Sequence, residues 1–292
     1  MCIFKGSGVA LITPFSNIGV DYNKLGELIE WQISEGTDAI ITCGTTGEAS
    51  TMTEAEKKEV IKFTVDKVNK RIPVIAGTGG NNTASSIEMS KYAEKIGVDG
   101  LLVITPYYNK TNSIGLFKHF EAINNAVTTP IMLYNVPSRT GMNISPSALV
   151  SLSKLSNVVA VKEASGDINQ IMRMKALCKD TIDIYSGNDD QIVPVLAAGG
   201  VGVISVLANI APKITHTITE LYFNGDIKKS LDLQLEYLEL IDSLFIETNP
   251  IPVKTALNLM GMNIGKLRLP LYDMESNTKD ILTKSLIKYK LI

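Results

Sequence analysis

The stretch Val158-Val159-Ala160-Val161-Lys162 determines which fold the sequence predicts. Its four apolar residues, of which three are β-branched, predict a short buried strand, and a lysine stands where that strand ends. Similar apolar runs begin near residues 9, 39, 74, 101, 131, 182 and 201, so that successive runs are 19 to 35 residues apart. The sequence therefore predicts eight strands.

The stretches between these runs carry helix signals of three kinds. They are a shared apolar face (Leu25, Leu28, Ile29, Ile33), a capping box (Thr53, Glu56) and an N-cap followed by proline (Ser145, Pro146). Eight alternating strand and helix units require parallel strands and can close into a (β/α)8 TIM barrel, which is the α/β fold we predict. A doubly wound open sheet is the alternative, but it would gather polar motifs at one switch point, whereas here they follow at least six strands.

The end of the chain has a different character. The strand signals stop after about residue 225, and residues 228–245 and 280–291 indicate helices. We therefore predict a catalytic barrel over residues 1–224 and a C-terminal helical extension over residues 225–292 that packs on it. No linker rich in proline and serine separates the two.

Composition narrows the class of function. The chain has 292 residues, 45% of them hydrophobic and 20% charged, as in globular proteins with a sizeable core. With 28 basic and 30 acidic residues the net charge is −2, so we expect small-molecule partners and no nucleic acid. Cys2, Cys43 and Cys178 are too far apart for a metal or redox motif, and we expect no metal and a cytoplasmic location. The longest apolar stretch, residues 192–208, is interrupted by Pro194 and glycines, so we expect no membrane span.

Lys162 is the leading catalytic candidate because barrels place catalytic groups at the C-terminal ends of their strands. A lysine that is partly removed from water keeps a fraction of its side chain as the neutral amine, which can attack a carbonyl carbon and form a Schiff base. The alternative is a structural ion pair with Glu163 or another acid. Position alone does not decide between the two.

Imine formation needs a proton carrier. His119 and His216 lie away from the predicted strand ends, so we interpret both as structural. Tyrosine must then carry the proton, and the candidates are Tyr134, which ends the strand before that of Lys162, together with Tyr107 and Tyr108. For each tyrosine, ordinary packing is the alternative.

Two loops have the character of anion sites. Gly44-Thr45-Thr46-Gly47-Glu48 follows the second strand, and its small residues would let backbone N–H groups approach a carboxylate or phosphate. Arg139, after the fifth strand, offers a planar fork for a second carboxylate, unless it is a plain surface arginine. Gly77-Thr78-Gly79-Gly80 is similar to a dinucleotide loop, but Asn82 replaces the last glycine, so we expect no nicotinamide cofactor.

Five segments carry a resemblance to a known family. They are Gly44-Thr45-Thr46-Gly47-Glu48, Thr105-Pro106-Tyr107-Tyr108-Asn109, Tyr134-Asn135-Val136-Pro137-Ser138-Arg139-Thr140-Gly141, Lys162-Glu163-Ala164-Ser165-Gly166 and Asn249-Pro250-Ile251-Pro252-Val253-Lys254. Over nearly the whole chain the sequence resembles the dihydrodipicolinate synthase family of pyruvate-dependent Schiff-base aldolases. The segment with Arg139 points to the synthases, since relatives that cleave sialic acid or sugar acids generally place other residues there.

The resemblance implies a lyase in which pyruvate condenses with Lys162 and attacks L-aspartate 4-semialdehyde, giving 4-hydroxy-tetrahydrodipicolinate for lysine and diaminopimelate biosynthesis. It implies a proton relay of Thr45, Tyr108 and Tyr134, in which Tyr108 comes from a neighbouring subunit of a dimer or, more usually, a homotetramer. The implied substrate-binding residues are Thr46, Arg139, Ile204 and Gly187. No organic cofactor is implied. An aldolase for a sugar-derived aldehyde and a catalytically silent, metabolite-binding barrel are the alternatives.

The sequence departs from members of the family that are inhibited by lysine. Where those members carry a serine, two histidines and a glutamate, this chain has Ala49, Glu54, Lys57 and Ser85, although Asn81 and Tyr107 are retained. The ligand would lose a carboxylate partner at Ser85 and meet a like charge at Lys57. We therefore expect little or no inhibition by lysine.

Overall fold

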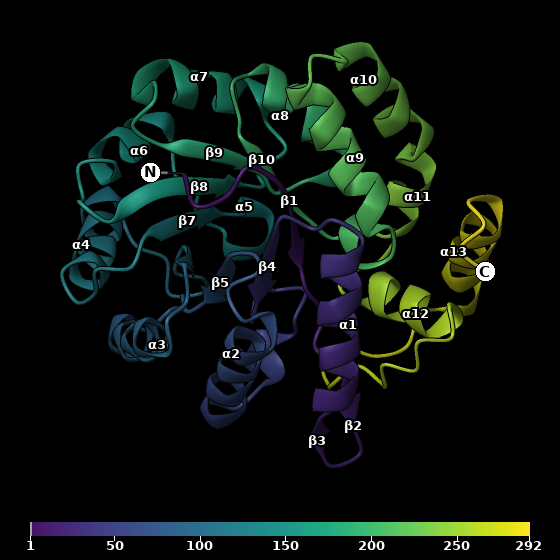
Figure 1. Ribbon diagram of the computed structural model, residues 1–292. Helices are drawn as coiled ribbons and strands as arrows, with labels where there is room; N and C mark the ends of the chain where they lie inside the picture. The colour runs from purple at the N-terminus through teal and green to yellow at the C-terminus, as the bar shows by residue number, and fades with distance from the viewer. Residues whose placement is uncertain (1) are drawn as a thin grey trace.

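The computed structural model describes residues 2–292 and contains a closed barrel of eight parallel strands (Figure 1). The strands are β1 (Gly6–Ala10), β4 (Ala39–Thr42), β5 (Val74–Gly77), β6 (Gly100–Ile104), β7 (Ile131–Asn135), β8 (Val158–Glu163), β9 (Asp183–Ser186) and β10 (Gly202–Ser205). The barrel closes through pairing of β1 with β10. The predicted TIM barrel is confirmed, and each strand begins within a few residues of its predicted position.

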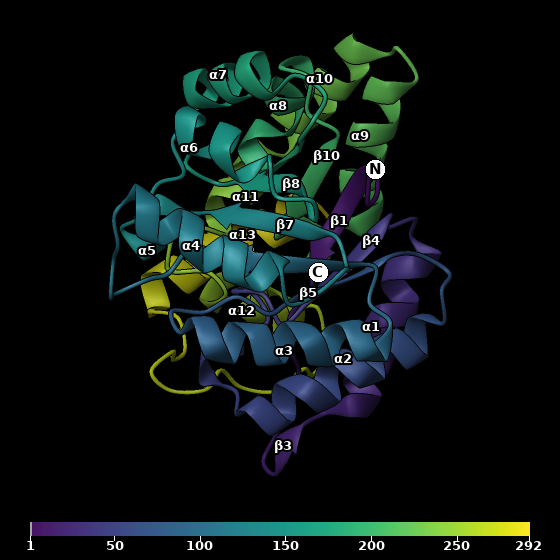
Figure 2. The same ribbon diagram turned by 90° about the vertical axis from the view of Figure 1, so that its left-hand side faces the viewer.

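A ring of helices surrounds the strands (Figure 2). In chain order they are α1 (Tyr22–Ser34), α2 (Glu54–Val68), α3 (Thr83–Ile96), α4 (Ser113–Asn124), α6 (Pro146–Leu152), α7 (Ile168–Cys178), α8 (Ile192–Ala197) and α9 (Pro212–Phe223). The predicted capping box is present, since Thr53 and Glu56 satisfy each other's backbone N–H groups at the start of α2. Ser145 caps α6 as predicted.

Several short elements were not predicted, because none is long enough to show a period of its own. They are the hairpin of β2 (Phe15–Ser16) and β3 (Gly19–Val20), the short helix α5 (Pro137–Thr140) and the 3-10 turns η1 (Ala49–Thr51), η2 (Asp189–Gln191) and η3 (Leu207–Asn209).

The strands bury both of their faces, as parallel barrel strands do. Residues that point outward, such as Val103 and Leu133, pack against the helices. Residues that point inward fill the barrel, and Tyr185 stacks on Phe4 with ring centroids 4.5 Å apart. Tyr134 belongs to this inner set, so its direction is fixed by the alternation along β7.

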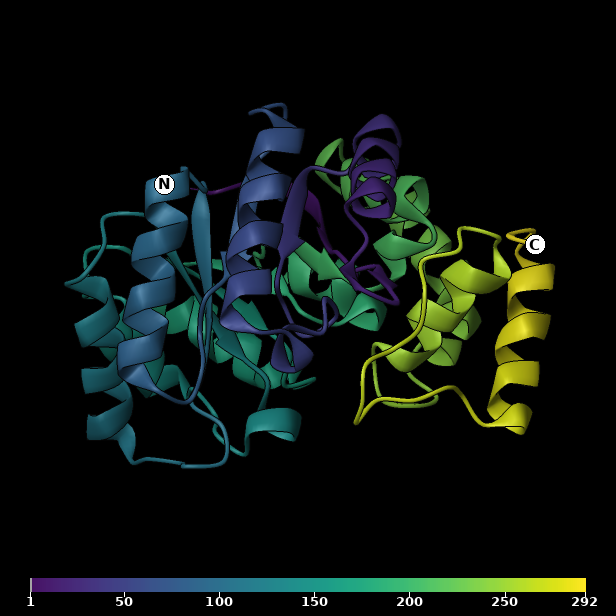
Figure 3. The ribbon, with the colours of Figure 1, turned by 90° about the horizontal axis from the view of Figure 1, so that it is seen from below.

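Four further helices follow the barrel and gather on one side of it (Figure 3). They are α10 (Ile227–Glu236), α11 (Leu238–Ser243), α12 (Ile251–Leu259) and α13 (Ser276–Lys288). The single helix predicted over residues 228–245 is divided at Tyr237, and α12 was not predicted. The division into units 1–224 and 225–292 stays a prediction.

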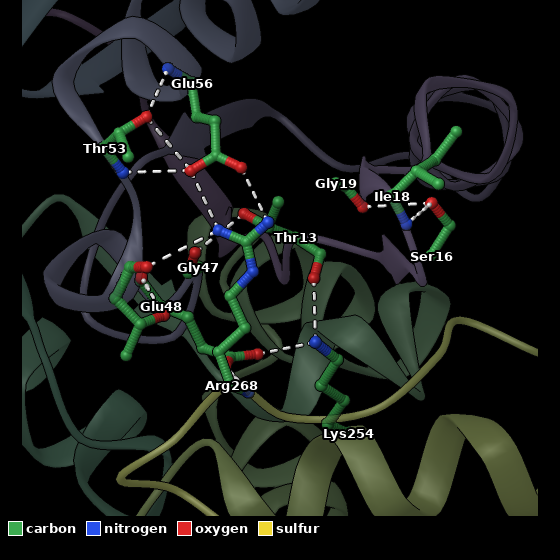
Figure 4. Close-up of polar contacts among 11 residues, drawn as sticks. Thr13, Ser16, Ile18, Gly19, Gly47, Glu48, Thr53, Glu56, Lys254 and Arg268 are labelled. Carbon is green, nitrogen blue, oxygen red and sulfur yellow. Dashed lines mark hydrogen bonds and ion pairs between the residues drawn. The ribbon is translucent and has the colours of Figure 1, made fainter.

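A buried ion pair joins this helical region to the barrel (Figure 4). Lys254 on α12 places Nζ 2.6 Å from Oε1 of Glu48, and the two side chains are 1% and 0% exposed. The amine also donates to the carbonyl of Thr13 at 3.0 Å, and the second Glu48 oxygen accepts the backbone N–H of Arg268. Burial lowers the pKa of Lys254, while the charge of Glu48 opposes that change. Glu48 is the last residue of the segment 44–48, here called the 44–48 loop. The ion pair therefore connects this loop to the C-terminal helical region.

We expect Lys254→Met to reduce the free energy of unfolding by about 3–5 kcal/mol, because it leaves the Glu48 carboxylate buried without its cation. The double variant Glu48→Gln/Lys254→Met should be more stable than the single one, because no buried charge is then left unpaired. Lys62→Met, which breaks an exposed pair with Asp66, is the control and should cost less than about 1 kcal/mol. Thermal and denaturant unfolding measure all three, and a single variant as stable as the control would contradict the role given to the pair.

Candidate active site

The centre of the candidate site is a lysine and a tyrosine from neighbouring strands. Lys162 on β8 and Tyr134 on β7 are paired in register, so both side chains point into the barrel near the C-terminal ends of the strands. The Lys162 amine lies 4.4 Å from the centre of the Tyr134 ring, and each residue is only 6% exposed. The structure therefore brings together a shielded amine and a tyrosine of a neighbouring strand.

Glu163 does not form an ion pair with Lys162. Its carboxylate accepts hydrogen bonds from the Ser165 backbone and from Nδ2 of Asn135, each at 2.8 Å, on the other face of β8. Burial raises the pKa of Glu163, and these hydrogen bonds oppose the rise. This geometry disfavours the structural interpretation of Lys162 as half of a pair with its neighbour.

The 44–48 loop places Thr45 and Thr46 beside the barrel mouth. It is a tight turn in which the Glu48 N–H donates to the Thr45 carbonyl at 3.1 Å, and the Thr46 hydroxyl accepts from Nδ2 of Asn249 at 3.0 Å. Burial raises the pKa of the preceding Cys43 thiol to about 12. Cys43 therefore stays a neutral thiol at ordinary pH and does not compete with Lys162 as a nucleophile.

The glycines after β5 have a packing role. A Cβ atom at Gly77 would lie 2.1 Å from the Cys43 carbonyl oxygen, and one at Gly79 would lie 2.4 Å from the Ile104 nitrogen. The backbone at these positions passes directly against neighbouring strands, where only glycine fits. This explains the glycine spacing that is similar to a dinucleotide loop.

A pocket of about 270 Å³ opens beside Tyr134 and Thr45. Its lining also includes all six residues compared with the lysine-sensitive pattern: Ala49, Glu54, Lys57, Asn81, Ser85 and Tyr107. Lys162 is not part of this lining, but Tyr134, whose ring contacts its amine, forms one wall. The pocket thus adjoins the lysine without containing it.

Tyr108 and Arg139 stand apart from this centre. Tyr108 is 92% exposed and has φ of 69°, in the left-handed region that residues other than glycine seldom adopt. Arg139 lies on α5, and its Nη2 donates to the backbone carbonyl of Asn249 at 2.8 Å. In the single chain the structure does not bring Tyr108 together with Thr45 and Tyr134.

Gly187 directly follows β9, and Ile204 lies on β10, the next strand around the barrel. The Gly187 N–H donates to the Glu163 carbonyl at 2.7 Å, and a Cβ atom there would lie 2.5 Å from that of Ala164. Ile204 on β10 is fully buried in the same inner cluster as Tyr134. Both positions therefore border the interior into which Lys162 points.

Two residues at the site were not predicted. Asn249 contacts both Thr46 and Arg139, yet it follows no strand, and the only signal for it was its motif. Asp189 is buried after β9 and accepts the backbone N–H groups of Val206 and Leu207 at 3.0 and 2.9 Å. Burial raises the pKa of Asp189, and the nearby Lys162 charge is among the factors that oppose this rise.

The histidines lie elsewhere. His119 on α4 is 2.9 Å from the Thr83 hydroxyl, and His216 on α9 is 3.0 Å from a carboxylate oxygen of Asp38, at the start of β4. Within residues 2–292 no group of three or more His, Cys, Asp or Glu side chains could hold a metal ion. Over the same residues no helix has the length and apolar character needed to cross a membrane.

The chain is similar to characterised proteins along its whole length. The sequence profile described as the Dihydrodipicolinate synthetase family matches residues 3–289. A 4-hydroxy-tetrahydrodipicolinate synthase of Clostridium tetani is 65% identical over 293 residues, which cover 100% of both chains.

Solved structures agree with this similarity. The dihydrodipicolinate synthase of Acinetobacter baumannii complexed with pyruvate superposes with a TM-score of 0.96 at 40% identity, covering 99% of each chain. A monomeric dihydrodipicolinate synthase variant superposes with a TM-score of 0.97 at 42% identity, covering 99% of this chain and 98% of the other. With its TIM barrel, its buried lysine and tyrosine and its matched length, this chain belongs to the dihydrodipicolinate synthetase family.

Proposed function

We propose that this chain is a lyase that condenses pyruvate with L-aspartate 4-semialdehyde to give 4-hydroxy-tetrahydrodipicolinate, in lysine and diaminopimelate biosynthesis. The observation that carries the proposal is the Lys162 amine, shielded in the barrel and 4.4 Å from the Tyr134 ring. Relatives 64–65% identical to this chain have the name of this synthase. An aldolase for sugar-derived aldehydes and a silent barrel are therefore not favoured.

The reaction begins when the neutral Lys162 amine attacks the pyruvate carbonyl carbon. Loss of water from the resulting carbinolamine gives a protonated imine, and loss of a methyl proton converts this imine into an enamine. The enamine carbon attacks the aldehyde, and the amino group of the semialdehyde then displaces Lys162 as the ring closes. The protonated imine accepts the electron pair of the methyl C–H bond, and the enamine returns it to the aldehyde carbon, so the scheme requires no organic cofactor and no metal.

Tyr134, Thr45 and Tyr108 are the proposed proton relay. Tyr134 is supported by its contact with Lys162, and Thr45 by its position with Tyr134 in one pocket wall. A tyrosine hydroxyl can donate a proton to the carbinolamine and accept one from it. The pyruvate carboxylate would be held by backbone groups of Thr45 and Thr46.

Arg139 would bind the carboxylate of the semialdehyde. One of its guanidinium nitrogens is already fixed by the Asn249 carbonyl, which leaves the other N–H groups for an anion. Ile204 would direct its carbonyl toward the Lys162 amine, and Gly187 would border the substrate. These roles suit the two carboxylates of the two proposed substrates.

Tyr108 supports a shared site between two copies of the chain. Its exposed side chain and its φ of 69° suit a residue that reaches into the pocket of a neighbouring subunit. We infer a homo-oligomer of at least two chains, and a tetramer made of two such dimers. One solved relative is a monomeric variant. The three cysteines are free, which supports a cytoplasmic enzyme.

Trapping of the Schiff base with borohydride tests the proposal. Pyruvate and borohydride should label the wild-type enzyme on the peptide that contains Lys162, and Lys162→Ala should abolish labelling because it removes the nucleophile. Lys118→Ala, on the exposed face of α4, is the control and should be labelled like the wild type. Peptide mass analysis identifies the labelled residue. A labelled peptide without residue 162 would contradict the assignment of Lys162 as the Schiff-base lysine.

Mixed oligomers test the shared site. If Tyr108 acts in the partner's pocket, Tyr108→Phe and Lys162→Ala chains should each be inactive alone but regain activity together. Each mixed pair has one site with both an intact lysine and an intact tyrosine. Initial rates after reassembly measure this, with oligomers of each variant alone as controls, and no regained activity in verified mixed oligomers would argue against the shared site.

Lysine should inhibit this enzyme weakly or not at all. Lys57 brings a positive charge into the pocket, and Ser85 supplies no carboxylate for a ligand that carries two ammonium groups. Initial rates against rising lysine check this prediction, and the variant Lys57→His/Ser85→Glu, which removes the like charge and restores a carboxylate, should become more sensitive. Clear inhibition of the wild type at sub-millimolar lysine would overturn it.

A further inference from the structure

The motif of residues 249–254 has no part in the proposed chemistry, yet its first residue contacts two groups of the site. We propose that Asn249 is a positioning residue that couples the two carboxylate-binding groups, Thr46 and Arg139. This inference rests on the proposed function and deepens it. It assigns to the C-terminal region a role in substrate binding.

The contacts of Asn249 come from two different parts of the residue. Its side-chain Nδ2 donates to the Thr46 hydroxyl oxygen at 3.0 Å, and its backbone carbonyl accepts from Nη2 of Arg139 at 2.8 Å. Asn249 is 5% exposed and Thr46 is 3% exposed, so water competes little for the first bond. One residue thereby sets the position of a group from each carboxylate site.

The direction of the first bond matters for binding. Because the amide donates, it occupies an electron pair of the Thr46 oxygen and leaves the hydroxyl proton free to join the backbone groups of Thr45 and Thr46 in binding the pyruvate carboxylate. A carboxylate in place of the amide could only accept, so it would turn the hydroxyl proton toward itself. It would also place a negative charge beside the pyruvate carboxylate.

The second bond restricts a mobile side chain. Arg139 is exposed on the short helix α5, where a free guanidinium would sample many rotamers. The Asn249 carbonyl fixes one edge of its planar fork and so lowers the entropy that is lost when a carboxylate binds the remaining donors.

Residues 249–254 are themselves held in place by further polar contacts. Lys254 donates its backbone N–H to the Pro250 carbonyl at 3.0 Å, and its amine contacts Glu48 and Thr13. Residues 249–254 are thus tied to the 44–48 loop twice, at Thr46 and at Glu48. Asn249 moves with the loop whose threonine it orients.

The side chain of Asn249 is not optimised for stability. Among the described residues its buried Oδ1 has no hydrogen-bond partner, and an unsatisfied buried oxygen opposes folding. Removal of the amide should therefore change stability little, in contrast to Asn258 on α12, whose side chain makes two hydrogen bonds, to Ile264 and Gly265.

The test compares Asn249→Ala with Asn258→Ala. Asn249→Ala keeps the backbone carbonyl for Arg139, so KM for pyruvate should rise about tenfold, roughly the loss of one buried hydrogen bond, and KM for the semialdehyde should change less. Its unfolding midpoint should stay close to that of the wild type. Asn258→Ala should lower the midpoint and leave both KM values unchanged.

Two further variants show whether Asn249 acts through Thr46. Asn249→Asp, which is nearly isosteric, should raise KM for pyruvate more than Asn249→Ala does. In a Thr46→Val background, Asn249→Ala should have little further effect on KM. Additive effects, or an unchanged KM for pyruvate in both Asn249 variants, would overturn the positioning role.

The same series separates this inference from the proposed function. A wild-type enzyme that is labelled by pyruvate and turns over both substrates, together with Asn249 variants of normal KM, would remove only the role of Asn249. A wild-type enzyme that is neither labelled nor active would remove the proposed function, and with it the roles of Thr46 and Arg139.

Discussion

The pairing of Tyr134 with Lys162 across two parallel strands is the constraint on which the site depends. Successive side chains of a strand point to opposite faces, so a shift of one residue in β8 would turn Lys162 toward the helices and Glu163 into the barrel. The closed barrel prevents such a shift, because each strand is paired on both sides and β1 pairs with both β4 and β10. The pairing register of β7 and β8 therefore decides that the Lys162 amine points into the barrel.

Much of the barrel could be predicted because its signals are local. The valines before Lys162 indicate a strand, and so does Ile131-Met132-Leu133 before Tyr134, although each strand continues one residue beyond its predicted end. The role of Asn249 could not be predicted in this way. It contacts Thr46 across 203 positions of sequence, and its motif runs into the first turn of α12, which begins among prolines. The exposure of Tyr108 and its left-handed backbone likewise have no signal in the composition.

The buried pair of Lys254 and Glu48 shows a compromise between stability and specificity. Two charges are removed from water to fix one loop, where apolar side chains of similar volume could be equally stable. Each charge has further partners, Thr13 for the lysine and the Arg268 N–H for the glutamate, and these offset part of the desolvation. The pair also specifies which face of α12 meets the barrel, which an apolar contact would define less sharply.

The position of residues 249–254 near the end of the chain has a consequence for biosynthesis. A ribosome makes the N-terminal part first, so all eight strands, of which the last ends at Ser205, are translated before Asn249 and Lys254. When the last strand has been synthesised, the 44–48 loop still lacks both of its contacts with residues 249–254. Both contacts of the loop with residues 249–254 therefore form only after the whole barrel sequence has been synthesised.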